Sequence, residues 1–253
     1  MEFISGLVSI SFRKLSYKEI IDITAESGLS AIEWGGDVHV PLGELDIADK
    51  VRLATAERGL TVPEYGSYYV ISKSGAEKAQ AAISSARALG TRVIRVWASD
   101  KNRSAMSDEE YLAAVEDAKM LCDSAPDLTF CLECHNHSIT EDYRDAAAYI
   151  ADVGRANFKT FWQPNQFRDH SYNTEALEAL LPSVVSVHVF SWEGNAHYPL
   201  DHHAERWADY LAILKRSDAD KIHLMLEFMH DNSQASLKNT ADVLNRWIAQ
   251  INQ

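Results

Sequence analysis

Short apolar runs recur along the chain, and a stretch with apolar residues at helical spacing follows most of them. The runs predict strands at residues 3–10, 31–34, 60–65, 92–97, 128–133, 158–163, 184–190 and 222–228. The stretches between them predict helices, for example at 16–27, 77–90, 108–122 and 236–251. Strands that alternate strictly with helices pair in parallel, and eight such units close naturally into a barrel. The pattern therefore predicts the α/β class and a (β/α)8 TIM barrel.

Capping residues fit the same order of elements. Predicted helix N-caps are Ser16, Ser107, Thr140 and Asn173, and predicted C-terminal glycines are Gly28, Gly59 and Gly90. No linker or change of composition divides the chain, and 253 residues is a usual length for one such barrel. We therefore expect a single TIM-barrel domain over residues 1–253.

Composition and charge narrow the class of protein. A hydrophobic content of 46% supplies a full core. The formal net charge of −13, without a Lys- or Arg-rich stretch, argues against nucleic acid as a partner. No apolar run is long enough for a membrane span, so we expect no membrane contact. Three cysteines, an odd number, fit a reducing compartment, and we expect a cytoplasmic protein.

The stretch FCLECHNHSIT at residues 130–140 combines cysteine, glutamate and histidine at the end of a predicted strand. Alternate side chains of a strand share a face, so Cys131, Glu133 and His135 point one way and Cys134 points the other. A redox pair needs both cysteines close together, and this geometry excludes one. Glu133 lies at the carboxyl end of its strand, which is the catalytic side of a TIM barrel.

On the later predicted strands, polar residues lie near the carboxyl end, at the same level as Glu133. Gln163, His188 and Glu227 each interrupt or end a largely apolar run. One buried polar residue is usually a satisfied core group, but two carboxylates, an imidazole and an amide that converge need a neutralising charge. A divalent cation with oxygen and nitrogen ligands would supply it. The alternative is a hydrogen-bonded polar cluster without metal.

The chain resembles the xylose isomerase-like TIM barrel superfamily, which includes the sugar phosphate isomerase/epimerase family. The resemblance covers nearly the whole chain and rests on AIEWGGDVHVP (31–41), LECHNH (132–137), FWQPNQF (161–167), VHVFSW (187–192) and LMLEF (224–228). It implies a metal on Glu133, Gln163, His188 and Glu227. The family usually has Asp where this chain has Gln163, which removes one negative charge and implies weaker metal binding.

The resemblance also implies a reaction. In ketose epimerases of this type the glutamates on strands 5 and 8 transfer protons, and these roles fall on Glu133 and Glu227. We therefore expect an isomerase or epimerase that uses one divalent ion (Mn, Mg, Co or Zn) and acts on a ketose or keto-polyol through an enediolate. Three alternatives stay open: an inosose dehydratase-like lyase, a C-glycoside-cleaving subunit and a non-catalytic sugar-binding barrel. Endonuclease IV-like DNA repair shares the fold but conflicts with the acidic charge.

Further polar and aromatic residues follow the strands and suit a sugar, because rings stack on its C–H faces and polar groups bond its hydroxyls. The predicted substrate contacts are Glu33, Asp37, His39, Arg95, Trp97, His135, Trp192 and His197. An ordinary loop contact is the alternative for each of them. The expected partner is a small-molecule sugar, and its identity is not legible in the sequence. Barrels of this type often dimerise, so a homodimer is compatible with the chain.

Overall fold

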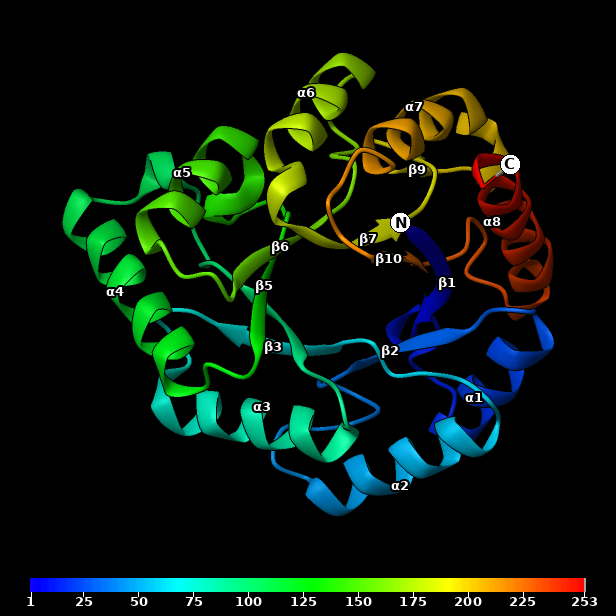
Figure 1. Ribbon diagram of the computed structural model, residues 1–253, viewed down its shortest axis with the longest axis horizontal. Helices are drawn as coiled ribbons and strands as arrows, with labels where there is room; N and C mark the ends of the chain where they lie inside the picture. The colour runs from blue at the N-terminus through cyan, green and yellow to red at the C-terminus, as the bar shows by residue number, and fades with distance from the viewer. Residues whose placement is uncertain (253) are drawn as a thin grey trace.

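Eight parallel strands close into a barrel in the computed structural model, which describes residues 1–252 (Figure 1). The strands are β1 (Glu2–Val8), β2 (Ala31–Gly35), β3 (Tyr65–Val70), β4 (Val93–Trp97), β5 (Thr129–Glu133), β6 (Phe158–Trp162), β7 (Val184–Val189) and β10 (Lys221–Leu226). Neighbours along the chain are neighbours in the barrel, and β1 closes it by pairing with β10, where Leu7 lies opposite Leu226. The predicted α/β class and the (β/α)8 barrel are confirmed.

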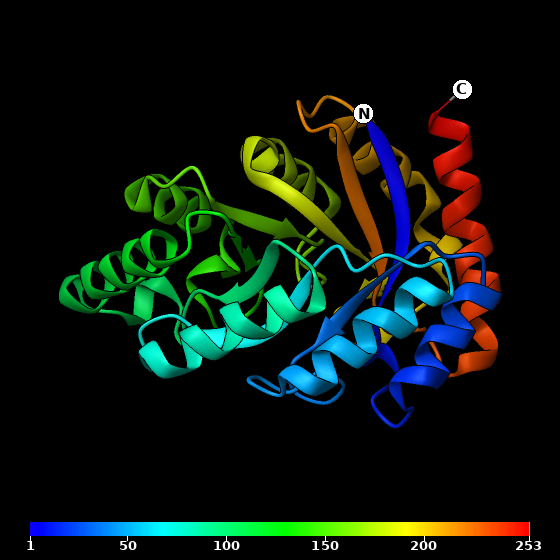
Figure 2. The same ribbon diagram turned by 60° about the horizontal axis from the view of Figure 1, so that its bottom comes forward.

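Helices form a ring outside the strands (Figure 1). They are α1 (Tyr17–Glu26), α2 (Leu45–Glu57), α3 (Gly75–Leu89), α4 (Asp108–Ser124), α5 (Tyr143–Val153), α6 (His170–Leu180), α7 (Ala204–Leu214) and α8 (Leu237–Ile251). Figure 2 shows the last helix, α8, running beside the first strand, β1, so the two ends of the chain complete the ring together. A short hairpin of β8 (Trp192–Glu193) and β9 (Ala196–His197) lies outside the barrel.

The apolar core fills the layer between strands and helices. Its largest fully buried side chains include Trp162, Trp207, Tyr149 and Phe130. Burying one Leu, Ile or Phe side chain stabilises a fold by about 1.5–3 kcal/mol, so this layer supplies most of the driving force. Inside the barrel, toward the carboxyl ends of the strands, several buried side chains are instead charged.

The third strand begins later than its hydrophobic pattern predicts. The sequence favours 60–65, but β3 starts at Tyr65, and Thr61 forms only an isolated bridge with Ala31. Pro63 explains the difference, because proline has no N–H to donate to a strand ladder. The shift places Glu64 at the entrance of β3, where its side chain is completely buried.

Two of the four predicted N-caps are wrong. Ser16 and Ser107 form capping boxes at α1 and α4 as predicted. Asp142 caps α5 instead of Thr140, and Asp169 caps α6 instead of Asn173. Thr140 and Asn173 bond to the loops at the barrel mouth: Thr140 Oγ1 donates to the Glu133 carbonyl at 2.6 Å, and Asn173 Oδ1 accepts from Asn165 N at 2.7 Å.

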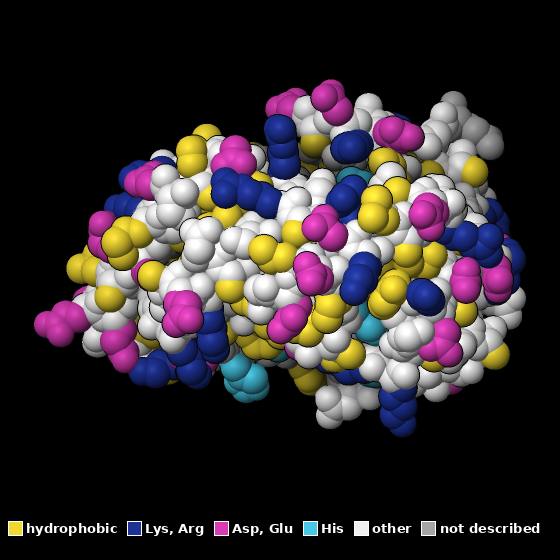
Figure 3. Space-filling view, turned by 90° about the horizontal axis from the view of Figure 1, so that it is seen from below, with side chains coloured by type: hydrophobic (Ala, Val, Ile, Leu, Met, Phe, Trp, Pro, Cys, Tyr) yellow, Lys and Arg dark blue, Asp and Glu magenta, His cyan; other side chains and the backbone are white. Residues whose placement is uncertain are grey.

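The surface shows mixed charge on the side drawn in Figure 3, where Lys and Arg side chains are interspersed with Asp and Glu side chains. Apolar side chains lie scattered among them. Within residues 1–252, each helix is too short or too polar to span a bilayer.

Candidate metal centre and active site

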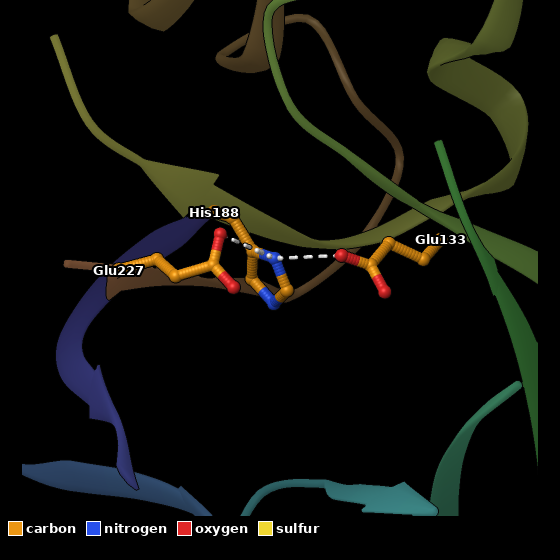
Figure 4. Close-up of side chains that lie close together, drawn as sticks. All are labelled: Glu133, His188 and Glu227. Carbon is orange, nitrogen blue, oxygen red and sulfur yellow. Dashed lines mark ion pairs between the residues drawn. The ribbon is translucent and has the colours of Figure 1, made fainter. Parts of the chain in front are cut away.

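Three of the predicted ligands meet inside the carboxyl end of the barrel. Glu133 ends β5, His188 lies in β7 and Glu227 directly follows β10. One ligand atom from each lies within 4.8 Å of the other two, and all three side chains are buried. Figure 4 shows the two glutamates reaching one nitrogen of His188 from opposite sides. His188 Nδ1 is 3.8 Å from Glu133 Oε1 and 3.5 Å from Glu227 Oε2.

Gln163, which directly follows β6, completes this group. Its Oε1 lies 3.0 Å from His188 Nδ1. The predicted set of four residues is therefore brought together around one nitrogen atom. The neutral amide lies closer to His188 Nδ1 than the carboxylates of Glu133 and Glu227 do.

The two nitrogens of His188 have different surroundings. Nε2 lies 2.8 Å from Glu33 Oε2 and donates to it, because an ionised carboxylate only accepts. Burial alone would lower the pKa of His188, but the negative charges of Glu227 and Glu33 outweigh it and raise that pKa to about 9. With Nε2 protonated, Nδ1 either carries a second proton or presents a lone pair.

The residues fit a small divalent cation. Nδ1 of His188 faces oxygens of Gln163, Glu227 and Glu133 at 3.0–3.8 Å, and one N–H can bond only one of them well. Ligands that contact a cation at about 2.1 Å lie roughly 3–3.5 Å from one another. Mixed carboxylate, amide and imidazole ligation suits Mn, Mg, Co or Zn.

A buried ion-pair network lies behind the cluster. Arg95 Nε donates to Glu33 Oε1 at 2.7 Å, and Arg95 Nη1 donates to Glu133 Oε2. Burial would raise the pKa of Glu33, but the charges of Arg95 and His188 reverse this and lower it to about 2. Arg95 thus fixes one oxygen of Glu133 and keeps Glu33 ionised beside His188. Arg95 Nη2 has no hydrogen-bond partner in the described part of the chain.

A pocket with a cavity volume of about 120 Å³ opens beside the cluster. Glu133, Gln163 and Glu227 form part of its wall. The remaining wall is rich in aromatic rings, amides and hydroxyls, with Trp162, Trp192, Phe228, Tyr143, Tyr172, Asn136, Asn165, Gln166 and Thr140 among its residues. Such a surface can stack on C–H faces while bonding hydroxyl groups, which suits a polyhydroxylated ligand.

Among the predicted substrate contacts, His135 and Trp192 line this pocket. Trp97 stacks on His135 with ring centres 4.7 Å apart, and His197 stacks on Trp192 at 4.4 Å. Trp97 and His197 therefore support the residues that face the pocket. Contact of His135 and Trp192 with substrate stays a prediction.

Glu33, Arg95, Asp37 and His39 lie outside the pocket wall and bond other groups of the chain, and their contact with substrate stays a prediction. Glu33 and Arg95 are buried and bond each other. Glu33 also bonds His188, and Arg95 also bonds Glu133. Asp37 forms an ion pair with Arg13.

His39 is buried as well. Its ring nitrogens lie 3.1 Å from Ser9 Oγ and 3.1 Å from the Leu15 carbonyl. Burial lowers the pKa of His39. Both nitrogens are thus used within the fold, so His39 positions the chain after β2.

Sequence reasoning missed several pocket residues. Asn165 and Gln166 lie in the FWQPNQF stretch, and Tyr143 and Tyr172 lie in the first turns of α5 and α6. Their signal was available, because polar and aromatic residues just beyond the carboxyl ends of barrel strands face the mouth. Glu64 was also missed, since the strand was predicted to begin at residue 60, five residues before β3 begins.

Glu64 lies inside the barrel, away from the pocket wall. Ser186 Oγ donates to its Oε1 at 2.7 Å, and its Oε2 has no partner in the described part of the chain. Burial and the nearby charge of Glu33 raise the pKa of Glu64 to about 8. This carboxyl group is therefore mostly protonated at neutral pH.

The cysteines are free, as the strand geometry predicted. Cys131 is buried inside the barrel, and burial raises its pKa well above the usual range. Cys134 contacts Thr160 Oγ1 at 3.7 Å on the other face of the strand, and burial raises its pKa to about 12. Thiols in such surroundings are poor nucleophiles, so they contribute packing.

Comparisons with known proteins give matches in structure only. No protein-family model matches the chain, and a search of curated proteins finds no sequence match. The probable 3-DHS dehydratase AsbF of Bacillus anthracis aligns with a TM-score of 0.79 and 20% identity over 97% of this chain and 99% of that one.

Two other solved structures are similar over nearly their full lengths. L-ribulose 3-epimerase aligns with a TM-score of 0.73 and 16% identity over 99% of this chain and 95% of that one. The IolI protein with a bound zinc atom aligns with a TM-score of 0.73 and 13% identity over 99% and 98%. At these identities the likeness is one of fold. The chain therefore shares the TIM-barrel fold of these proteins over nearly its whole length.

Proposed function

We propose that this protein is a divalent-metal-dependent enzyme that transfers protons at the carbon beside the carbonyl of a hydroxy ketone, as a sugar isomerase or epimerase. One observation carries the proposal: Nδ1 of His188 faces oxygens of Gln163, Glu133 and Glu227 at the wall of a polar and aromatic pocket. The zinc bound to the structurally similar IolI protein supports it.

Glu133, Gln163, His188 and Glu227 would hold the ion. A bound divalent cation would polarise the substrate carbonyl and make the neighbouring C–H more acidic. Glu33 fixes the tautomer of His188, because it accepts a hydrogen bond from Nε2–H and so leaves Nδ1 to present a lone pair to the ion. Arg95 fixes Glu133 by bonding its second oxygen.

Glu133 and Glu227 act as the proton-transfer pair. They reach His188 from opposite sides (Figure 4). A substrate bound beside His188 would therefore lie between the two carboxylates. Arg95 binds Oε2 of Glu133 and leaves Oε1 toward the cluster, and burial raises the pKa of Glu227 against the opposing charge of His188. One carboxylate removes a proton, and the other returns it on the opposite face or at the neighbouring carbon. The first outcome is epimerisation and the second is isomerisation.

Dehydration is the second candidate, and the likeness to the probable dehydratase AsbF favours it. The same first step, removal of a proton beside a carbonyl, leads to dehydration when a β-hydroxyl group then leaves. The products distinguish the two candidates. An epimerase or isomerase conserves the mass of its substrate, whereas a dehydratase yields a product that is lighter by one water.

Hydrogen exchange with solvent tests the proposal. We expect Mn²⁺-loaded protein to incorporate deuterium from D₂O beside the carbonyl of at least one ketose or keto-inositol, as read by NMR. Glu133→Gln and Glu227→Gln keep the shape and an oxygen ligand but remove the base. Each should slow exchange by about 10²–10⁴-fold or more.

A matched control is Glu178→Gln, which changes a surface glutamate of α6 paired with Arg216. This variant should exchange at the wild-type rate. If either glutamate variant in the cluster exchanges as fast as wild type with excess Mn²⁺, the two-carboxylate mechanism is wrong. Protein that folds but takes up no stoichiometric metal would favour a non-catalytic barrel.

A further inference from the structure

A second, smaller cavity adjoins the pocket, and we infer that it binds a carboxylate group at the far end of the substrate. The substrate is then a polyhydroxylated keto acid, and Arg168 and Arg206 are the residues that select it. This inference rests on the function proposed above, because it assigns the second cavity to the same substrate. The charge of the cavity wall, the bonding of its two arginines and its size carry it.

The second cavity shares part of its wall with the pocket. The residues that line both are Pro164, Asn165, Gln166, Asn173 and Trp192. The first three of them directly follow Gln163, so one loop carries a predicted metal ligand at its start and Arg168 five residues later. The two spaces therefore adjoin, and a substrate held at the metal cluster reaches the second cavity with its far end.

The two walls differ in charge. Three glutamates, Glu133, Glu141 and Glu227, line the pocket, and no Lys or Arg of residues 1–252 does so. The second cavity has the opposite pattern, because Arg168 and Arg206 line it and no Asp or Glu of the described chain does. This cationic wall stands out in a chain with a formal net charge of −13. Positive charge at this place favours an anionic group of the ligand.

Arg168 is held in place without an ion pair. Its guanidinium lies 5.1 Å from the ring centre of Tyr172, and it has no hydrogen-bond partner among the residues that the structure describes. The backbone N–H of Arg168 donates to the Asn165 carbonyl at 3.0 Å, which fixes the loop. The exposed side chain can therefore present its planar set of N–H donors to a carboxylate without first breaking an internal bond.

Arg206 is oriented by a partner outside the cavity wall. Its Nη2 donates to Glu193 Oε1 at 2.7 Å, and Glu193 lies in the hairpin of β8 and β9. A guanidinium has several N–H donors, so this bond fixes Arg206 and leaves donors for a second acceptor. Gly194 N donates to the Gln166 carbonyl at 2.8 Å, which ties the hairpin to the loop that carries Arg168. The segments around the two arginines therefore hold each other in position.

The size of the cavity favours a carboxylate over a phosphate. Its volume is about 20 Å³, which is close to the space that one water molecule needs. The two coplanar oxygens of a carboxylate need little more than this, whereas a tetrahedral phosphate needs clearly more. Phe190, Trp192 and Trp207 form an apolar part of the wall and can pack against the carbon chain that leads to the carboxylate.

Binding of unreactive polyols tests the inference apart from turnover. Sorbitol, L-gulonate and sorbitol 6-phosphate lack a carbonyl beside a C–H and differ only at carbon 6, which bears a hydroxyl, a carboxylate or a phosphate. Trp192 lines both cavities and gives a fluorescence signal. We expect Mn²⁺-loaded protein to bind L-gulonate at least about tenfold more tightly than sorbitol. Equal or weaker binding of L-gulonate overturns the inference, and tighter binding of the phosphate than of L-gulonate overturns the choice of a carboxylate.

Arg168→Met shows whether the carboxylate binds in the second cavity or on the metal ion. This variant keeps an unbranched side chain but lacks the charge and the donors. It should weaken L-gulonate binding by about tenfold or more and leave sorbitol binding unchanged. Arg206→Met should act in the same direction. If Arg168→Met binds L-gulonate as wild type does, the carboxylate does not reach the second cavity and the inference is wrong.

Arg144→Met is the matched control. Arg144 also lies over a tyrosine ring, 4.3 Å from the centre of Tyr143, but it lines neither the pocket nor the second cavity. The change in net charge is the same as in Arg168→Met, so L-gulonate binding should stay as in wild type. An equal loss of affinity in both variants would show a general effect of charge and overturn the assigned site.

Deuterium exchange separates this inference from the proposed function. Fructuronate is fructose with carbon 6 oxidised to a carboxylate, and we expect its kcat/KM to be at least about tenfold higher than that of fructose. Arg168→Met should raise the KM for fructuronate and keep kcat. Binding of L-gulonate that depends on Arg168, without exchange on any ketose or keto acid, would overturn the function and leave the carboxylate site standing. Exchange with equal kcat/KM on fructose and fructuronate would overturn the carboxylate site and leave the function standing.

Discussion

Gln163 shows how a single side chain can set the strength of a metal site. Its amide oxygen lies 3.0 Å from His188 Nδ1, at the position where the resemblance noted from the sequence implies a carboxylate. The affinity of hard cations rises with the number of charged ligands. At the residue scale, the identity of this one group therefore controls metal affinity.

We predict that Gln163→Glu, which keeps the length of the side chain, tightens Mn²⁺ binding by about tenfold or more. Isothermal titration at pH 7.5 measures this. Gln163→Met, of similar length without an amide, is the control and should weaken binding. Unchanged affinity in both variants would place Gln163 outside the coordination sphere.

His223 supplies a pH dependence of stability that is separate from the metal site. It lies in β10 and is buried, and burial together with the charge of Lys221 lowers its pKa to about 4. In the unfolded chain a histidine has a pKa of about 6.5. Between these values the unfolded chain binds more protons, so stability falls as pH drops below about 6.5 and levels off near 4.

The full effect of this histidine is on the order of 3 kcal/mol. We predict that His223→Gln loses less stability than wild type between pH 7 and pH 4.5, because carboxylate effects are common to both proteins. Urea denaturation at the two pH values measures the difference. Parallel losses in the two proteins would show that His223 titrates normally in the fold.

The strand β3 contributes to the site through Gly66, whose lack of a side chain leaves room for Arg95 and Glu33. A Cβ atom at Gly66 would lie 2.6 Å from Arg95 Nη2 and 2.7 Å from Glu33 Oε1. Neither atom can retreat freely, because both belong to the buried ion-pair network. At the scale of elements, β3 must approach β2 and β4 closely so that Glu33 and Arg95 can meet.

We predict that Gly66→Ala displaces this pair and lowers both stability and metal affinity. Overpacking of a buried site typically costs about 1–3 kcal/mol. Thermal denaturation and Mn²⁺ titration of the same preparation measure the two effects. A variant with wild-type stability and metal affinity would mean that the network tolerates displacement and does not position His188 and Glu133.

The barrel as a whole should respond to metal, because the ligands come from four different strand ends. Glu133 ends β5, Gln163 follows β6, His188 lies one residue before the end of β7, and Glu227 follows β10. An ion that binds only the folded barrel stabilises it by about 2.7 kcal/mol at a hundred times its Kd. For a protein of this size that corresponds to a rise in Tm of roughly 5–10 °C.

We predict this rise on addition of Mn²⁺ and its reversal by EDTA, as followed by circular dichroism. Glu227→Gln should reduce the rise, because the variant keeps an oxygen but loses a charge. Glu178→Gln again serves as the surface control and should show the full rise. A Tm that does not depend on Mn²⁺ concentration in wild type would contradict a metal site in the barrel.

Much of the fold and part of the site follow from local patterns. The alternation of apolar runs and amphipathic stretches predicted the barrel, and the position of Glu133 and His188 near the ends of their strands placed both at its carboxyl end. The third strand was misplaced because an apolar run was weighed above Pro63. Thr140 and Asn173 were misread as caps, because a capping residue and a loop-bonding residue look alike in sequence.

The roles of charged residues depended on contacts between distant strands. Glu33 bonds His188, 155 positions away in the sequence, and Arg95, 62 positions away, and the sequence did not predict either contact. His39 likewise has partners from another segment of the chain, Ser9 and the Leu15 carbonyl. The pattern of one segment predicts the direction in which a side chain points. It does not predict which residue of another segment that side chain will contact.

The sequence by itself determined the barrel and the level at which Glu133, Gln163, His188 and Glu227 lie, because strand period and parallel closure bring the carboxyl ends together. The tertiary structure alone decided which polar groups bond one another, where the pocket opens and which arginines line the cavity beside it. The physical reason is that hydrogen bonds and ion pairs in the barrel depend on register and on distances of a few ångströms between remote segments. Burial of an apolar side chain depends only on the face of the strand or helix on which it lies. The alternation of apolar and polar residues along the sequence already specifies that face.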